Sequence, residues 1–474
     1  MNRKRIYNLL LSLILIFSGT ACTKWLDVKP KTEVSETVLF ENEQGFKDAM
    51  TGVYTQLGSV DLYGKEFTMG FMDVLAQNYN VSINTHVYYQ ARNYNYLDIG
   101  TRSKIDNFWI SSYKAIANLN NLLRQIDQKK NVFAGINYEI IKGEALALRA
   151  FLHFDLLRAF GPVPLNNMDA ESIPYSREFN MNVKPVLSLK QFTQECLDDL
   201  SEASKLLASD KNVYYGNSEM YKANTRNHMN YWAATGLMAR IYLYRNEHTI
   251  AYQKAKEVID AKIFPFISSS SISSNSSPDR IFSTEHLFAV YVADLRDIND
   301  ELFRSFVNFN NVLTNTSGFT NNRYELSSGG STDYRFLFLW KSDGVTAARY
   351  PVKYRFDDIG SNAGSTTIKR IPLIRLSEMY YICAETSTVS TDKIDFLNEV
   401  RLNRGLATLA KNLTDQAIEN EIFKEYKKEF YQEGQLFYYY KRKNRLKIEG
   451  YGPDVSNKVY VLPVPDNETE YTTE

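Results

Sequence analysis

The stretch that decides the fold is Lys142–Leu165, KGEALALRAFLHFDLLRAFGPVPL. From Gly143 to Phe160 it predicts one helix, because apolar residues recur at spacings of three and four around most of its circumference. A helix with so little polar surface must be buried by other elements on several sides. Small residues such as Gly143 would let those partners approach closely. Gly161-Pro162 then ends the helix, since glycine tolerates a left-handed cap and proline cannot continue the hydrogen-bond ladder.

The overall composition is that of a globular protein without a charge bias. The 474 residues include 55 Lys+Arg and 55 Asp+Glu, so the formal net charge is zero. This argues against nucleic-acid binding, which usually needs a positive excess. Tyrosine (33) and phenylalanine (27) are abundant beside 4 tryptophans. Most of these rings must lie in the core, but so many tyrosines also leave amphipathic rings for recognition.

The first 21 residues predict a secretory signal, followed by a lipid anchor. A positive start (Arg3–Arg5) precedes a short apolar run (Leu9–Phe17) and small residues that lead to Cys22. The apolar run is too short for a convincing membrane-spanning helix. A cysteine directly after the small residues is typical of bacterial lipoproteins, in which Cys22 is acylated and becomes the mature N-terminus. The alternative is an ordinary signal with a chance cysteine.

Two other cysteines, Cys196 and Cys383, lie within helical patterns. They are either two buried thiols or one disulfide, and we favour two thiols. No CxxC pair and no paired-histidine spacing occurs in the sequence, so we expect no metal site and no cofactor.

Helical periodicity covers most of the remaining chain. Besides the central helix, the pattern predicts helices over 41–57, 105–127, 189–207, 230–244, 249–261, 372–386, 392–404 and 414–440. Three antiparallel pairs resemble degenerate tetratricopeptide units, namely 105–127 with 138–160, 230–244 with 249–261, and 372–386 with 392–404. The helices therefore predict a mostly α scaffold.

Two regions, about 60–100 and 262–370, lack helical periodicity. The first mixes aromatic and polar residues, and the second carries repeated glycines and a Ser/Asn-rich run at 268–277. Within the second, 287–292 and 352–356 predict short strands. Long loops on a rigid scaffold are where binding tends to reside, so we expect these regions to form a ligand face.

Several stretches resemble the SusD/RagB family of outer-membrane nutrient-uptake lipoproteins. GEALALRAFLHFDLLRAFGPVPL (143–165) is similar to the family's central stretch. ARIYLY (239–244), STEHLFAV (283–290), PLIRLSEMYYICAE (372–385), LNEVRLNRGL (397–406), YKKEFYQEGQLFYYYKR (426–442) and LPVPDNE (462–468) follow in the family's order. The resemblance spans nearly the whole mature chain, and so implies one SusD-like domain over residues 22–474.

The resemblance implies a non-enzymatic, lipid-anchored protein on the surface of the outer membrane. It would capture an oligosaccharide and deliver it to a SusC-like, TonB-dependent transporter as its partner. A peptide-binding, RagB-like protein would share that fold and partner. A purely structural lid that binds nothing itself is a third reading, and a secreted hydrolase is a less favoured fourth.

Glycan recognition needs flat apolar faces for sugar rings, with amide and guanidinium groups for hydroxyls. The two irregular regions supply this mixture. The candidate ligand-binding residues are Tyr79, Tyr88, Tyr89, Arg92, Asn93, Tyr94, Tyr96, Arg323, Tyr334 and Trp340. The competing reading of any one ring is that it packs beneath its own loop.

A catalytic site is not predicted. His153 and Asp155 in the central helix point to different faces, so they do not form a catalytic pair. Asp155 and Arg158 instead have the spacing of a local ion pair. No GxSxG, HExxH or phosphate-binding glycine loop is found in the sequence.

Overall fold

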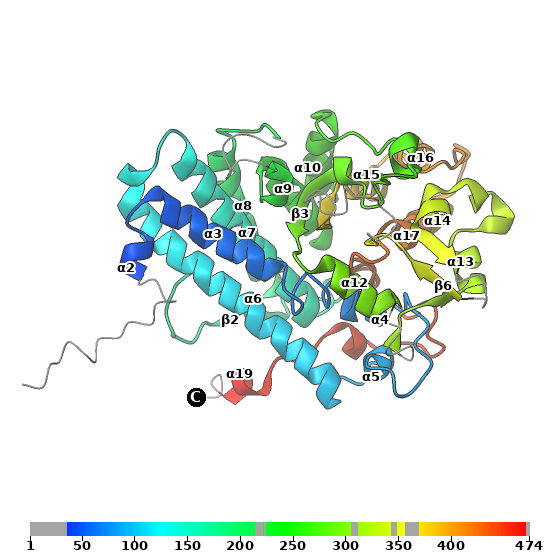
Figure 1. The fold of residues 1–474 in the computed structure, drawn as a ribbon, viewed down its shortest axis with the longest axis horizontal. Helices are drawn as coiled ribbons and strands as arrows, with labels where there is room; N and C mark the ends of the chain where they lie inside the picture. Colours follow the sequence, from blue (N-terminus) through cyan, green and yellow to red (C-terminus); the bar gives the residue numbers. More distant parts are fainter. Residues whose placement is uncertain are drawn as a thin grey trace, which may run out of the picture.

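The computed structural model describes residues 36–213, 221, 224–304, 311–342, 348–355 and 369–470. The signal segment, Cys22 and Phe356 therefore lie outside the described residues. The molecule is elongated in projection, with α2 (Glu36–Leu39) at one end of its long axis and the short strands near α13 (Ser317–Arg323) and α14 (Tyr334–Leu339) at the other (Figure 1). Long helices fill the end that holds α2, and short elements gather at the opposite end.

The long helices form the scaffold, and most of them match the predicted ranges. They are α3 (Glu43–Leu57), α6 (Ile99–Ile126), α7 (Asn137–Phe160), α8 (Leu189–Leu207), α9 (Tyr231–Tyr244), α10 (His248–Asp260), α15 (Leu376–Thr386), α16 (Ser390–Leu402) and α17 (Asp415–Glu429). The three predicted pairs correspond to α6 with α7, α9 with α10, and α15 with α16, and each pair is in contact. The mostly helical prediction is confirmed.

Shorter elements connect them. The short α-helices are α2 (Glu36–Leu39), α4 (Phe71–Leu75), α5 (Tyr89–Arg92), α11 (Ser269–Ile272), α12 (Leu295–Arg304), α13 (Ser317–Arg323), α14 (Tyr334–Leu339), α18 (Leu436–Arg442) and α19 (Asp466–Glu470). The 3-10 turns are η2 (Asp127–Val132), η3 (Thr225–Asn227), η4 (Ser283–Glu285), η6 (Leu326–Ser328), η7 (Gly330–Thr332) and η9 (Asn457–Tyr460).

The strands form three small antiparallel sheets. Their members are β1 (Glu171–Pro174) with β2 (Val186–Ser188), β3 (His286–Tyr291) with β7 (Arg370–Arg375), and β4 (Asn315–Thr316), β6 (Ala348–Pro351) and β5 (Trp340–Ser342) in the order β4-β6-β5. In the central pair, His286 faces Arg375 and Tyr291 faces Arg370. Every residue of β7 is buried, so this pair belongs to the core.

Helix α7 is the hub that the sequence predicts. Every residue from Gly143 to Phe160 is buried, and α3, α6, α8 and α9 all pack against it. A Cβ on Gly143 would lie 2.7 Å from Cγ of Leu207 in α8, so this glycine is needed for the close approach of the two helices. The helix begins at Asn137, one residue before the start of the predicted pair member 138–160 and six residues before Gly143.

The end of α7 differs from the prediction. Gly161 has φ −72° and ψ 164°, so it does not form a left-handed cap. Its N–H still donates to the carbonyl of Leu157 at 2.8 Å. A Cβ at this position would lie 2.7 Å from that same carbonyl oxygen. Glycine is required here for space rather than for an unusual backbone angle.

The predicted helix over 414–440 is wrong, because the chain breaks between α17 and α18. Gln432 and Gly434 have positive φ values of 65° and 68°. Their N–H groups donate to the buried carboxylate of Asp73, at 2.6 and 3.2 Å. A distant acceptor therefore stabilises the break, and local periodicity could not reveal it.

Other predictions for the irregular regions were wrong in detail. Residues 352–355, the described part of the strand predicted over 352–356, are not a strand: β6 ends at Pro351, and these residues form a turn. Residues 372–375 belong to β7 rather than to the helix that was predicted from 372. Helix α12 was missed within 262–370, and so were short helices in both irregular regions. Short elements carry too few periods for a pattern to be recognised.

Candidate functional site

The two irregular regions meet in space, although residues 101–261 separate them in sequence. The N–H of Asn80 donates to the carbonyl of Thr314 at 2.9 Å. The amide of Asn315 donates to the carbonyl of Asn78 at 2.7 Å. The N–H of Val87 donates to Oδ1 of Asn311 at 3.1 Å. These bonds join the 78–87 segment to the start of β4.

Three of the predicted residues converge on one aromatic ring, that of Tyr431. Ring centroids of Trp340 and Tyr79 lie 4.7 and 5.6 Å from it, and the guanidinium of Arg323 lies 5.3 Å from it. All four side chains are buried. Tyr79, Arg323 and Tyr431 therefore lie beneath the candidate ligand face, whereas Trp340, although largely covered, also lines a pocket. Tyr431 itself was missed, because it falls in a segment that the sequence predicts as plain helix.

A buried carboxylate lies beside this cluster. Asp73 is fully buried, and burial raises its pKa to about 7 in spite of the N–H groups of Gln432 and Gly434 that stabilise the charged form. The hydroxyl of Tyr79 donates to the carbonyl of Met69 at 2.7 Å, so this ring is fixed next to Asp73. The carboxylate therefore holds together segments 73–79 and 431–434.

Two further candidate rings, Tyr88 and Tyr96, are also buried. The hydroxyl of Tyr88 donates to the carboxylate of Glu66 at 3.0 Å. The hydroxyl of Tyr96 donates to the carbonyl of Val459 at 2.6 Å. In both cases the ring packs beneath its own loop, and its polar end ties that loop to another element.

The remaining candidates keep part of their surface in solvent. Arg92 donates to the carbonyl of Gly450 at 3.1 Å, and Asn93 donates to that of Tyr89 at 2.8 Å. The ring of Tyr94 lies 4.9 Å from that of Tyr451. These residues form one edge of the face, next to the chain that follows α18.

Tyr334 is also half-buried, but it lies apart from this edge. Its N–H donates to the carbonyl of Arg404 at 2.9 Å, and its ring lies 6.0 Å from that of Phe338. Burial thus argues against direct ligand contact by Tyr79, Tyr88, Tyr96 and Arg323. Ligand binding stays a prediction for Trp340, which lines a pocket, and for the partly exposed candidates Tyr89, Arg92, Asn93, Tyr94 and Tyr334.

A pocket of about 290 Å³ opens beside Trp340, within the second irregular region. It lies between the chain at 272–280 and the end of α14. Its lining combines the rings of Trp340 and Phe338 with the side chains of Arg280 and Asn275 and two serines. The indole N–H of Trp340 already donates to the hydroxyl of Tyr324 at 3.1 Å, so the tryptophan contributes an apolar surface. Lys341 also lines the pocket, so the lining offers apolar ring faces together with several hydrogen-bond donors, a combination that suits a hydroxyl-rich ligand.

Below the face lies a buried network of ion pairs. Glu429 accepts from Arg404, Arg375 and Arg335 at 2.6, 2.6 and 2.9 Å. Arg335 also pairs with Glu425 at 2.8 Å. Burial alone would raise the pKa of Glu425, but Arg335 and its other cationic neighbours outweigh this and lower the pKa to about 2. Because these charges are mutually satisfied, the network is structural.

The charges of α7 also tie elements together. Arg149 forms a two-pronged pair with Asp199 of α8, at 2.7 and 2.8 Å. Asp155 and Arg158 form the predicted ion pair, at 2.5 Å. His153 contacts the carbonyl of Arg149 through Nδ1 at 2.9 Å, and its Nε2 accepts from the N–H of Ser176 at 3.0 Å. Burial lowers the pKa of His153 to about 3, so the ring is neutral and structural.

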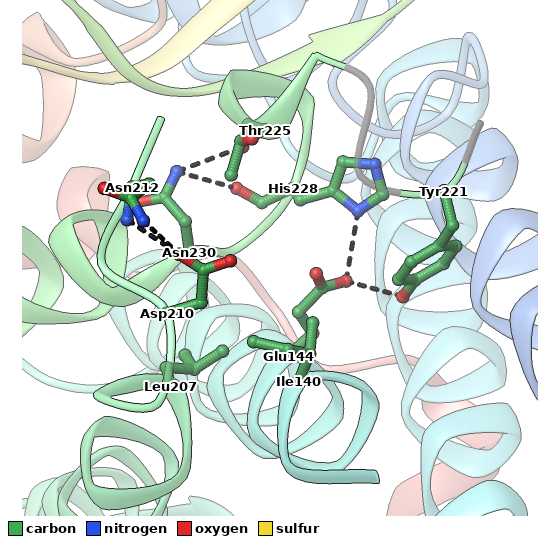
Figure 2. Close-up of a pocket in the computed structure, with 9 residues that line it drawn as sticks. All are labelled: Ile140, Glu144, Leu207, Asp210, Asn212, Tyr221, Thr225, His228 and Asn230. Atoms are coloured by element: carbon green, nitrogen blue, oxygen red, sulfur yellow. Dashed lines mark hydrogen bonds and ion pairs between the residues drawn. The ribbon is translucent and has the colours of Figure 1, made fainter. Parts of the chain in front are cut away.

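A second pocket lies against α7, and Figure 2 shows its lining. One carboxylate oxygen of Glu144 accepts from the hydroxyls of Tyr54 and Tyr221, both at 2.8 Å, and lies 3.1 Å from Nδ1 of His228. Glu144 thereby joins α7 to α3 and to the 221–228 segment. With a volume of about 30 Å³, the pocket has room for no more than one water-sized group.

Cys196 and Cys383 are both free and buried, which confirms the prediction of two core thiols rather than one disulfide. Burial raises the pKa of both thiols, so neither is a ready nucleophile. Over the described ranges, no group of three or more His, Cys, Asp and Glu side chains is arranged to hold a metal ion. No helix among the described residues is long and apolar enough to cross a membrane.

The structure defines a helical scaffold protein whose two irregular regions meet as a candidate ligand face. The family model described as "SusD family" matches residues 210–472, and the model described as "Starch-binding associating with outer membrane" matches residues 24–243. The chain belongs to the SusD family. Members of this family are non-enzymatic binding proteins, in agreement with the expectation that the chain has no catalytic residues.

Solved structures share the fold. A SusD superfamily protein from Bacteroides thetaiotaomicron has a TM-score of 0.70 at 20% identity, covering 90% of this chain and 98% of the other. A SusD-like carbohydrate binding protein from Bacteroides vulgatus has a TM-score of 0.70 at 19% identity, covering 90% and 96%. The SusD-like protein P25 of Formosa agariphila is 21% identical over 263 residues, which span 54% of this chain and about half (46%) of that relative.

Proposed function

We propose that this protein is a lipid-anchored, surface-exposed glycan-binding protein of the outer membrane. It captures an oligosaccharide and delivers it to a SusC-like, TonB-dependent transporter. The observation that carries the proposal is the pocket beside Trp340, where two aromatic rings stand next to guanidinium, amide and hydroxyl groups. Apolar rings pack on the C–H faces of sugars, and the polar groups bind the hydroxyls. The names of the matching family model and of the Bacteroides vulgatus structure support a carbohydrate ligand.

Calorimetry of the mature chain against panels of oligosaccharides and peptides tests the ligand class. We expect heat of binding with at least one oligosaccharide and none with the peptides. Peptide binding alone would favour the peptide-uptake alternative. No binding in either panel would favour a structural lid, and turnover of any glycan would contradict a binding-only role.

The variant Phe338→Ala locates the site. Phe338 is partly buried and lines the pocket, so its removal should weaken glycan binding roughly tenfold, as for the loss of one aromatic contact. The matched control is Phe396→Ala in α16, where an equally half-buried ring packs on Tyr252 instead. Equal weakening by both variants would show a general effect on folding and not a site at the pocket.

Anchor and partner need separate tests. Cys22→Ala should release the protein from the membrane fraction, and mass spectrometry of the N-terminal peptide should show the acyl chain on Cys22 only in the parent. Purification in gentle detergent should recover a large barrel protein in complex with the lipidated chain. Recovery of the chain alone, under conditions that preserve other such complexes, would count against the transporter partner.

A further inference from the structure

Two hollows lie on either side of the loop that joins β1 to β2, residues 175–185. The first, of about 460 Å³, lies between this loop and the helices α6, α7 and α8. The second, of about 540 Å³, lies between the loop, Tyr113 of α6 and Glu468 of α19. Asn180 lines both hollows, so they adjoin. We call them together the α6 groove, because along α6 their linings extend from Tyr113 to Asp127, roughly 20 Å at the rise of an α-helix.

Buried polar side chains fix the loop on α6. Asn120 is 2% exposed, and its amide donates to the carbonyl of Ser176 at 3.0 Å. Arg149, which is 5% exposed, donates to Oδ1 of Asn120 at 2.9 Å and to the carbonyl of Arg177 at 3.3 Å. The groove is therefore formed before any ligand enters, and binding to a preformed site requires little ordering of the protein.

Contacts within the loop add to this rigidity. Lys184 donates to the carboxylate of Glu178 at 2.7 Å, and so does the amide of Asn180, also at 2.7 Å. Both contacts fall on Oε2 of Glu178, so Oε1 keeps its capacity to accept hydrogen bonds from a ligand.

The groove offers apolar surface in both hollows. The ring of Phe179 lines the first, and the guanidinium of Arg124 lies 4.9 Å from the centre of this ring. Phe179 is nevertheless 41% exposed. The ring of Tyr113 lines the second hollow, together with Met181 and Val183. Ring faces and aliphatic groups of this kind pack on the C–H faces of sugars.

The polar part of the lining carries both signs of charge. Besides Arg149, which Asp199 neutralises, the first hollow is lined by the basic Arg124, Lys142 and Arg177 and by the acidic Asp127, Glu178 and Glu202. The acidic groups would repel an anionic polymer. Hydroxyl groups both donate and accept hydrogen bonds, so they match a lining that holds cations and carboxylates side by side. The groove therefore suits an uncharged, hydroxyl-rich ligand better than a phosphate or a sulfate.

The groove is separate from the pocket beside Trp340. Arg124, which lines the first hollow, forms an ion pair with Glu36 in α2. Helix α2 lies at one end of the long axis, whereas α14, which borders the pocket beside Trp340, lies towards the other (Figure 1). The two places therefore cannot be parts of one pocket.

We propose that the α6 groove is a second binding site for an uncharged oligosaccharide, in addition to the pocket beside Trp340. The proposal rests on the proposed function for the class of its ligand. A glycan strand held at one site binds the other as an intramolecular event, so two sites keep a long strand on the protein for longer than one site does.

The test follows the methyl group of Met181, which lines the second hollow. The mature chain with Cys22→Ser, which cannot be acylated, is labelled with ¹³C in the methionine methyl groups, and Met181→Leu identifies the Met181 signal by NMR. The probes are maltohexaose, cellohexaose, laminarihexaose and mannohexaose, with tetragalacturonate as the anionic comparison. We expect at least one of the four uncharged probes to shift the Met181 signal, and tetragalacturonate to leave it in place.

Variants locate the contact. Phe179→Ala should weaken the affinity measured from the Met181 shift roughly tenfold, as for the loss of one aromatic contact. Glu202→Ala, on the opposite wall of the first hollow, should weaken it several-fold through a lost hydrogen bond to a charged group. Phe338→Ala, in the pocket beside Trp340, should leave the Met181 shift unchanged. The disaccharide of the same sugar should bind at least tenfold more weakly, because it cannot fill both hollows.

The matched control is Val186→Ala. Val186 follows the same loop and is 45% exposed, but it is not part of either lining. This variant should leave the Met181 shift unchanged. All the variants remove exposed or partly exposed side chains, so their melting temperatures should stay close to that of the parent.

Several outcomes would overturn the proposal. These are a Met181 signal that none of the uncharged probes moves, a shift with tetragalacturonate alone, or equal weakening by Val186→Ala and Phe179→Ala. Calorimetric binding that Phe338→Ala weakens, beside an unmoved Met181 signal, would remove the groove and leave the proposed function standing. A shifted Met181 signal, with calorimetric binding that Phe338→Ala does not change, would keep the groove and remove the pocket beside Trp340, so the two failures are distinguishable.

Discussion

The hub helix α7 and the cluster around Glu429 are equally buried, but different forces stabilise them. In α7 the buried surface is mostly leucine, alanine and phenylalanine, whose removal from water supplies the free energy. Around Glu429 the buried groups are guanidinium and carboxylate. Their mutual attraction offsets the free-energy cost of removing them from water only if every partner is present. The comparison teaches that the apolar packing of α7 should tolerate the loss of a few contacts, whereas the ion-pair network around Glu429 should not tolerate the loss of a partner.

The largest effect is expected from Glu429→Ala. The change leaves the buried guanidinium groups of Arg404 and Arg375 without their shared carboxylate, and breaking a buried pair in this way costs roughly 3–5 kcal/mol. Urea unfolding measures the loss. The control is Asp395→Ala, whose partner Lys411 is exposed, and it should cost less than about 1 kcal/mol. Similar losses in both variants would contradict the contrast between buried and exposed pairs.

A smaller loss should follow Leu156→Ala in α7. Removing this fully buried side chain leaves a cavity and should reduce the free energy of unfolding by roughly 3 kcal/mol. Thermal unfolding of Leu337→Ala, in the partly exposed α14, provides the matched comparison, because that side chain is 46% exposed. If Leu337→Ala costs as much as Leu156→Ala, then α7 is not the centre of the core.

The third prediction concerns the pH dependence of stability, which should have opposite signs for the isolated buried carboxylate of Asp73 and for the carboxylates that are paired with arginine. The pKa of Asp73 is about 7 in the folded protein, above the ordinary 3.8. Between about pH 4 and 7 the folded state thus binds the additional proton, so Asp73 makes the free energy of unfolding fall as the pH rises, by at most about 1.4 kcal/mol per unit. Above about pH 7 this contribution levels off. Asp73→Asn should remove it, and unfolding curves at four pH values between 4 and 8 measure the slope.

For Glu385 in α15 the pH dependence of the free energy of unfolding has the opposite sign. Burial alone would raise the pKa of Glu385, but the attraction of Arg442, at 2.6 and 2.7 Å, and of Lys443 holds it at about 2. This ion pair is fully stabilising above about pH 4.5 and is lost as the pH falls through about 2. Glu385→Gln should therefore lower stability at neutral pH and flatten the acid limb of the curve. An unchanged acid limb would contradict the assignment.

The smallest effect on stability is expected from Tyr89→Ala at the edge of the ligand face. The ring is only partly buried, so its loss should change the free energy of unfolding by less than about 1 kcal/mol. If Tyr89 contacts ligand, as the sequence predicts, the same variant should weaken glycan binding several-fold in calorimetry. A change in stability without any change in affinity would place Tyr89 with Tyr88 and Tyr96, as part of the loop's own packing.

The candidate ligand face shows why the sequence could predict which two segments meet but not which of their rings face solvent. The mixture of rings and polar groups located two segments that do come together, through Asn80 and Thr314 among others. Whether a ring faces solvent depends on the partner that covers it. The hydroxyl of Tyr88 is held by Glu66, 22 residues away, and that of Tyr96 by Val459, 363 residues away, so no local pattern reveals that these rings are buried. The pocket beside Trp340 likewise depends on Arg280 and Asn275, which carried no signal of their own.

By itself the sequence determined the scaffold. Apolar residues at helical spacing predicted α7, α8 and the three helix pairs, because a long amphipathic or apolar helix repeats its pattern over many turns. Tertiary structure alone decided where Asp73 breaks the last helix, which tyrosines are buried, and that β7 pairs with β3. Those outcomes depend on hydrogen bonds and burial between segments distant in the chain, and periodicity within a segment contains no information about them.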